Sequence, residues 1–128
     1  MSRRREAARS ARQAARRRGR LAETICVWSL KLRGWRIVAR GWRVPMGEID
    51  IIARRGGTLA AIEVKARDTY AAAAEAVTLR QRRRVARAFA MFLASRPDLA
   101  QLAPRFDVML IVKLRWPRHL ADAWREEG

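Results

Sequence analysis

Two acidic residues and a lysine stand in two segments of the sequence that resemble neighbouring β-strands. Asp50 lies in "GEIDIIA", and Glu63 and Lys65 follow in "IEVKAR", with twelve residues between the two acids. Paired carboxylate oxygens are the ligands that a hard divalent cation such as Mg²⁺ or Mn²⁺ selects. The same residues also fit a surface hairpin with an ordinary network of ion pairs, and the residues alone leave both interpretations open.

The turn between these segments predicts how the charged side chains are placed. Gly56-Gly57 is a common choice for a two-residue hairpin loop, and this loop sets Asp50 opposite Glu63. Directly opposed residues share one face of the sheet, with β-carbons about 4.5–5.5 Å apart. In the same register Glu48 faces Lys65 and could orient its amine. Because two such carboxylates repel each other, the lysine or a bound cation must offset their charge.

The composition favours a polyanionic partner. The chain has 128 residues, which suits one domain, and 29 lysines and arginines against 12 acidic residues give it a net charge of +17. Such an excess recruits nucleic acid, DNA more readily than RNA, with ribosomal RNA or an anionic membrane surface as alternatives. Cys26 and His119 are the only residues of their types, so one chain can build neither a disulfide nor a Cys/His zinc site. No apolar stretch approaches the roughly 18 residues of a membrane span, and we expect a soluble, cytoplasmic protein.

Charge and apolar periodicity divide the chain into three parts. Residues 1–18 form an Arg-rich arm that repels itself and is predicted to be flexible, either as a nucleic-acid-binding arm or as a solvated tail. Residues 19–112 hold the periodic segments of one folded domain, and residues 113–128 form a C-terminal tail that could be helical. The expected elements are a helix from about residue 21, strands at 35–40, 48–53 and 59–65, a helix around 85–93, and a strand at 106–112. This α-β-β-β-α-β order predicts a mixed α/β domain.

These motifs resemble those of a known family. An aspartate followed after twelve residues by Glu-Val-Lys looks like the core motif of the PD-(D/E)xK, or restriction-endonuclease-like, nucleases. The sequences "GEIDIIA" and "IEVKAR", with "GRLAE" upstream and "EAVTLRQRRR" and "RFDV" downstream, resemble the uncharacterised bacterial YraN-like family, which is akin to archaeal Holliday-junction resolvases. The resemblance covers about residues 19–112. It implies a restriction-endonuclease-like core and a metal-dependent endonuclease on branched or otherwise structured DNA, with a homodimer as one possible assembly.

The resemblance also assigns roles to individual residues. Asp50 and Glu63 would bind Mg²⁺ or Mn²⁺ with the help of the Val64 carbonyl. Lys65 would position the attacking water and help to deprotonate it, and Glu23, from the first helix, would complete the catalytic and metal-binding acids. The expected nucleic-acid contacts come from a basic cluster, Arg80, Arg82, Arg83, Arg84 and Arg87, and from the polar Gln81 within it. Since these residues span about two helical turns, only a subset can meet one phosphate backbone. The alternative function is a nucleic-acid-binding protein that keeps the fold but does not cleave.

Other notable residues favour a structural interpretation. Trp28 and Trp35 are expected in the core or at an interface, and Cys26 as a small buried residue. Asp107, at the start of the last expected strand, is interpreted as structural in preference to a further acid of the site. His119 has no partner that the sequence reveals.

Overall fold

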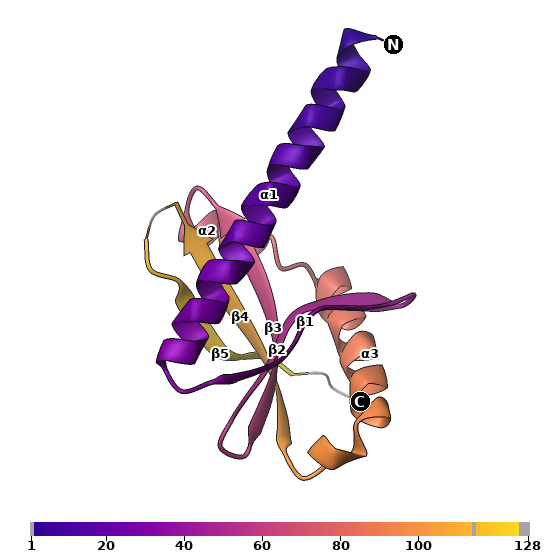
Figure 1. The fold of residues 1–128 in the computed structure, drawn as a ribbon, viewed down its shortest axis with the longest axis vertical. Helices are drawn as coiled ribbons and strands as arrows, with labels where there is room; N and C mark the ends of the chain where they lie inside the picture. The colour runs from indigo at the N-terminus through magenta and orange to yellow at the C-terminus, as the bar shows by residue number, and fades with distance from the viewer. Residues whose placement is uncertain (1, 114, 126–128) are drawn as a thin grey trace.

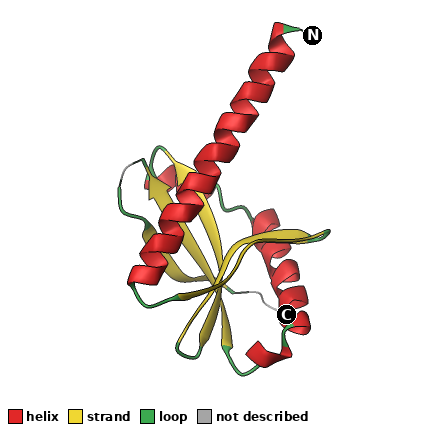
Figure 2. Cartoon of the chain, viewed as in Figure 1, coloured by secondary structure: helices red, strands yellow, loops and turns green. Residues whose placement is uncertain are grey.

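A computed structural model of the chain describes residues 2–113 and 115–125 (Figure 1). The helices are α1 (Arg3–Leu32), α2 (Tyr70–Glu75) and α3 (Leu79–Ser95), with a short 3₁₀ turn, η1, at Pro97–Leu99. The strands, yellow in Figure 2, are β1 (Arg36–Val44), β2 (Gly47–Arg55), β3 (Thr58–Arg67), β4 (Ala103–Val112) and β5 (Arg118–Trp124).

The described strands form a five-stranded sheet in the order β1-β2-β3-β4-β5. β3 and β4 pair in parallel, and the other neighbouring strands pair antiparallel. A parallel pair needs a long crossover connection, which α2 and α3 supply. Figure 1 shows α1 lying across one face of the sheet and α3 against the other. This architecture confirms the predicted mixed α/β fold class and is consistent with a nuclease-like core.

Two apolar clusters hold the long helices to the sheet. The apolar stripe of α3, Val85, Ala88, Phe89, Phe92 and Leu93, predicts its core face, and all of these residues except the half-buried Leu93 are buried. Under α1, Cys26 and Leu30 are fully buried against the sheet, and Trp35 joins the same cluster. The predicted burial of Cys26 and Trp35 is therefore confirmed.

α1 begins much earlier than the sequence predicted. We expected a helix from about Leu21 and a separate arm before it, whereas one continuous helix starts at Arg3, capped by the Ser2 hydroxyl, which accepts from the Arg5 amide. Its 30 residues span about 45 Å, and its first half projects beyond the sheet (Figure 1). No helix within the described residues has the length and apolar character needed to cross a membrane.

The apolar spacing of Leu21, Ile25, Trp28 and Leu32 predicts a core face for α1, but the helix buries a different face. Leu21, Trp28 and Leu32 are 62%, 62% and 72% exposed. Trp28 is therefore not in the core, and its alternative position at an interface stays a prediction. The helix instead packs through a face that includes the small residues Ala22 and Cys26, because small side chains let a helix approach a sheet closely.

The C-terminal segment belongs to the sheet. Residues 118–124 form the edge strand β5, antiparallel to β4, where the sequence predicted a tail outside the domain that could be helical. Most residues of β5 are exposed, so the strand lacks the apolar alternation by which strands are recognised. The six-residue helix α2 was also missed, because it is too short for a helical period to show.

The hairpin that carries the predicted acids has the predicted register. Arg55 faces Thr58 across the Gly56-Gly57 loop, and the ladder continues to Ile51 opposite Ile62. Gly56 has a φ of 57°, a conformation that glycine adopts without steric penalty.

Candidate active site

The pairing between β2 and β3 stops beside the two predicted acids. The ladder ends at Ile51 opposite Ile62, while the first part of β2 stays paired with β1. Beyond this point the Val64 amide of β3 donates to Asp50 Oδ2 at 2.8 Å. The Asp50 carboxylate thus takes the place of a backbone acceptor, and it is fixed where the two strands separate.

A cleft of about 380 Å³ opens between the separated strands and the first turns of α3. It contains the acid pair and the lysine of the predicted motif, together with three of the six predicted nucleic-acid contacts. Its lining residues are Glu48, Asp50, Glu63, Val64, Lys65, Arg80, Gln81, Arg84 and Val85. Residues from β2, β3 and α3 are therefore brought together in one site.

Local structure places the start of α3 against this cleft. The Thr78 hydroxyl accepts a hydrogen bond from the Gln81 amide at 3.2 Å and caps the helix. Gly47, the first residue of β2, passes so close to α3 that a β-carbon there would collide with the Arg84 carbonyl oxygen and lie 2.8 Å from its carbon. Because Gly47 has no side chain, β2 and α3 can approach each other closely. A helix N-terminus at such a place favours anionic groups, including phosphate.

The two carboxyl groups in the cleft do not both ionise readily. Burial raises the pKa of Asp50, opposed by hydrogen bonds from the Val64 amide and from Glu63 and by the charge of Lys65. Burial, and then repulsion from Asp50, raises the pKa of Glu63 to about 8. Near neutral pH, Glu63 therefore keeps a proton and donates it to the Asp50 carboxylate, as expected for like charges in a low-dielectric site.

Lys65 and Glu48 have partners that differ from those expected. Lys65 Nζ lies 3.4 Å from Glu63 Oε1, and Glu48 Oε2 lies 3.0 Å from Arg43 Nε on β1. The predicted contact between Glu48 and Lys65 is wrong, because β2 has separated from β3 by this point and pairs with β1. The lysine amine is held in the cleft by the neighbouring carboxyl of its own strand.

Glu23, the third predicted acid, lies beside the cleft and not in its lining. Its Oε1 accepts a hydrogen bond from Arg40 Nε at 3.3 Å. Burial and the charge of Asp50 raise the pKa of Glu23, against the opposing effect of Arg40. Glu23 is therefore within electrostatic reach of Asp50 but has a cationic partner of its own.

The predicted basic cluster is distributed around α3. The members that line the cleft are Arg80, Gln81 and Arg84. The side-chain oxygen of Gln81 is buried and has no hydrogen-bond partner in the described part of the chain. Arg82 lies over the Trp124 ring, with 5.8 Å from its guanidinium carbon to the ring centroid. Arg83 and Arg87 are exposed outside the cleft, so only a subset faces one way, as predicted.

The donor set of the cleft fits a hard divalent cation. Mg²⁺ in proteins is commonly held by one or two carboxylates together with waters and substrate phosphates. Asp50 and Glu63 form such a pair in the lining of the cleft. Across residues 2–113 and 115–125, no three His, Cys, Asp or Glu side chains are grouped to hold a metal. Glu23 is thus not gathered with the pair into one ligand group.

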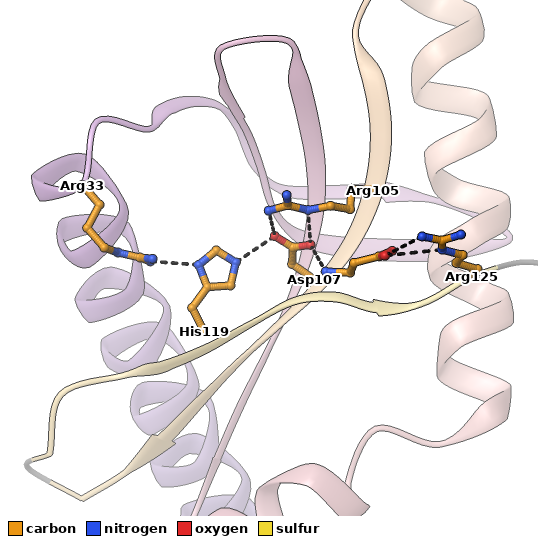
Figure 3. Close-up of polar contacts among 6 residues, drawn as sticks. Arg33, Arg105, Asp107, His119 and Arg125 are labelled. Carbon is orange, nitrogen blue, oxygen red and sulfur yellow. Dashed lines mark hydrogen bonds and ion pairs between the residues drawn. The ribbon is translucent and has the colours of Figure 1, made fainter.

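A second buried polar group surrounds Asp107, outside the cleft lining (Figure 3). Arg105 donates to both carboxylate oxygens at 2.8 Å, and the Asp122 amide donates to Oδ1 at 2.9 Å. Burial opposes ionisation of the fully buried Asp107, but these hydrogen bonds and one from His119 lower its pKa to about 2. Asp107 thus joins β4 to the edge strand β5, in agreement with its structural interpretation.

His119 is the buried residue whose partners the sequence did not reveal. Its Nε2 lies 2.7 Å from Asp107 Oδ2, and Arg33 Nη2 lies 2.9 Å from its Nδ1 (Figure 3). A guanidinium can only donate, so Nδ1 accepts and Nε2 carries the hydrogen given to the aspartate. The contact depends on the pairing of β4 with β5, an edge strand that the sequence pattern does not indicate.

The fold and the cleft define the class of protein: a mixed α/β domain, consistent with a nuclease-like core, with an acid pair and a lysine where a hairpin separates. Comparison with known sequences is more specific. The profile of the uncharacterised protein family UPF0102 matches residues 22–111, and the chain belongs to this family. This finding confirms the predicted relationship to the YraN-like family.

The chain is similar to UPF0102 proteins from several bacteria. The protein of Parvibaculum lavamentivorans is 54% identical over 112 residues, which are 88% of this chain and 84% of that protein. The protein of Paramagnetospirillum magneticum is 47% identical over 119 residues, 90% of this chain and 92% of its own. A Caulobacter protein is 43% identical over 125 residues, which cover 97% of this chain and 90% of the relative.

Proposed function

We propose that the chain is a metal-dependent endonuclease that hydrolyses phosphodiester bonds in branched or otherwise structured DNA. The observation that carries this proposal is the cleft in which Asp50, Glu63 and Lys65 lie together beside the cationic start of α3. The net charge of +17 supports a polyanionic substrate. A cytoplasmic location is part of the proposal.

The proposed roles are those that the family resemblance implies, and the positions of the residues in the cleft support them. Asp50 and Glu63 would hold Mg²⁺ or Mn²⁺, and such an ion, when bound, stabilises the negative charge that grows on the phosphate. Lys65, held against Glu63, positions the attacking water and helps to remove its proton. Arg80 contacts the phosphate backbone at the mouth of the cleft. Glu23 adds negative charge next to Asp50, so that Glu23→Gln reduces the rate less than a change in the acid pair does.

A cleavage assay tests this function. Linear, nicked, flapped and four-way DNA are incubated with Mg²⁺, Mn²⁺ or EDTA, using wild-type protein, Asp50→Ala and the control Asp98→Ala, an exposed aspartate outside the cleft. We expect product only with a cation, its loss in Asp50→Ala and its retention in Asp98→Ala. Absence of product from every substrate, or unchanged product from Asp50→Ala, contradicts the proposal. As a readout independent of cleavage, Mg²⁺ or Mn²⁺ should raise the melting temperature of wild type but not of Asp50→Ala.

The second candidate is a nucleic-acid-binding protein that does not cleave. Two observations favour this candidate. The described residues bring two carboxylates together in the cleft and not three, and the chain is strongly cationic. This candidate predicts salt-sensitive binding in EDTA and no product with either cation. The assay above therefore separates the two functions.

A further inference from the structure

A second hollow adjoins the proposed active site. It measures about 740 Å³ and lies between α1 and the C-terminal part of β3, and we call it the α1–β3 hollow. Val64 and Lys65 line both the hollow and the cleft. The C-terminal part of β3 is therefore a wall common to the cleft and the hollow.

The hollow has an apolar lining and a cationic edge. Its apolar residues include Leu21, Ala22 and Ile25 of α1, Ala66 of β3 and Ile111 of β4. Its charged residues are Lys65, Arg67, Lys113 and Asp68, three cations and one acid. Its volume falls in the range of about 300–1,000 Å³ that is usual for ligand sites. This combination suits a ligand with a flat apolar body attached to an anionic chain.

We infer that the α1–β3 hollow receives an unstacked base of the nucleic acid strand that lies in the neighbouring cleft. The inference rests on the proposed function and narrows its substrate to DNA with an unpaired nucleotide beside the bond that is cleaved. The apolar walls cover the base, Arg67 and Lys113 meet its flanking phosphates, and Asp68 accepts a hydrogen bond from an exocyclic amino group.

Selectivity for unpaired nucleotides follows from the energy of unstacking. A base must leave its helical stack to enter the hollow, and this step is least unfavourable where the base already lacks a partner. Bulges, branch points and flaps meet this condition, whereas a continuous duplex does not. The hollow thus gives a physical reason why structured DNA is preferred.

A binding measurement in EDTA tests the inference without relying on cleavage. Fluorescence anisotropy gives the Kd for two labelled duplexes that differ by one unpaired adenine. We expect the wild-type protein to bind the bulged duplex about tenfold more tightly, the gain that covering one base provides. With 2-aminopurine at the bulge, emission should rise on binding, because the base leaves its stack.

Two exposed leucines of α1 offer a matched pair of variants. Leu21 lines the hollow, whereas Leu32 is similarly exposed on the same helix but does not line it. Leu21→Ala should reduce the preference for the bulged duplex about threefold, and Leu32→Ala should leave it unchanged. Neither change should alter the Kd for the paired duplex. Ala66→Phe, which fills the hollow from β3, should abolish the preference in a protein whose circular dichroism is unchanged.

The outcomes separate this inference from the proposed function. Equal Kd values for the two duplexes, or equal effects of Leu21→Ala and Leu32→Ala, overturn the base-binding hollow even if the protein cleaves DNA. A bulge preference that Leu21→Ala weakens supports the hollow even if no substrate is cleaved. In that case the cleavage proposal fails alone, and the chain is a binder of unpaired nucleotides.

Discussion

Glu63 shows how strongly the cleft changes the chemistry of a common residue. On an open hairpin, two opposed carboxylates cost at most about 1 kcal/mol. Here both acids are buried in the cleft, so that repulsion and desolvation act together. A bound cation would take the place of the proton on Glu63.

We expect the protein without divalent cation to lose stability as the pH rises from about 4.5 to about 8. The pKa of Glu63 is raised from 4.5 to about 8, so the folded chain binds this proton more tightly than the unfolded chain. The resulting stabilisation is complete below the lower value and is lost as the pH passes the higher one. Melting temperatures between pH 5 and pH 9 in EDTA measure the effect.

Glu63→Gln should flatten this pH dependence, because the amide stays neutral throughout. Glu75→Gln, a change at an exposed position outside the cleft, serves as the control and should behave as wild type. If Glu63→Gln loses stability with pH as steeply as wild type does, the shared proton is not the cause.

Asp107 makes a different contribution, to stability and not to chemistry. Its carboxylate is fully buried and satisfied by Arg105, His119 and the Asp122 amide. Asp107→Ala should lower the free energy of unfolding by about 3 kcal/mol, because it leaves buried partners unpaired. Urea denaturation measures this change, and Asp98→Ala, which removes an exposed ion pair with Arg96, should have a much smaller effect. A loss below about 1 kcal/mol would contradict the structural role of Asp107.

The residues of the site could be predicted because their types and spacing are themselves the signal. Asp50, Glu63 and Lys65 are acids and an amine in strands joined by a tight turn, and period-two alternation puts them on one face. The partners of neighbouring residues could not be predicted. The contact of Glu48 with Arg43 depends on the separation of two strands, which no local pattern marks.

At the scale of elements, the cleft depends on how closely β2 approaches α3. The sequence predicted both elements and the core face of α3. It did not predict their close approach, because a glycine at the start of a strand is compatible with many local structures. The structure shows why Gly47 in particular is needed, since a β-carbon there would collide with the backbone of α3 at Arg84. A helix backbone cannot move aside as a flexible side chain can.

Gly47→Ala should therefore push α3 away from β2 and disturb the cleft. We expect it to lower the free energy of unfolding by about 1–3 kcal/mol, as is usual for overpacking, and to weaken any cation-induced rise in melting temperature. Gly57→Ala is the matched control, since a β-carbon at that position meets nothing within 4 Å. Equal stability of the two variants would show that β2 and α3 are less closely packed at Gly47 than the structure indicates.

At the scale of the whole molecule, the arginines in the first half of α1 carry part of the net charge of +17 beyond the sheet. Composition predicted a self-repelling arm, but a continuous helix from Arg3 gives its arginines fixed directions. Positions 5, 9 and 12 follow the spacing of four and three that places residues on one helix face. The prediction of a nucleic-acid-binding arm requires such a face to lie along a phosphate backbone, whereas the prediction of a solvated tail does not.

A pair of triple variants tests this face. Replacing Arg5, Arg9 and Arg12 by glutamine should flatten the dependence of log Kd on log salt by about 2.7 units on duplex DNA, since each neutralised phosphate contributes about 0.9. The control replaces three exposed arginines that lie on other faces of α1: Arg3, Arg4 and Arg17. Both variants lose the same charge, so a general electrostatic attraction would change both slopes equally. A larger change in the first variant is expected if the helix lies against the duplex, because only residues on the contacting face displace counterions from it.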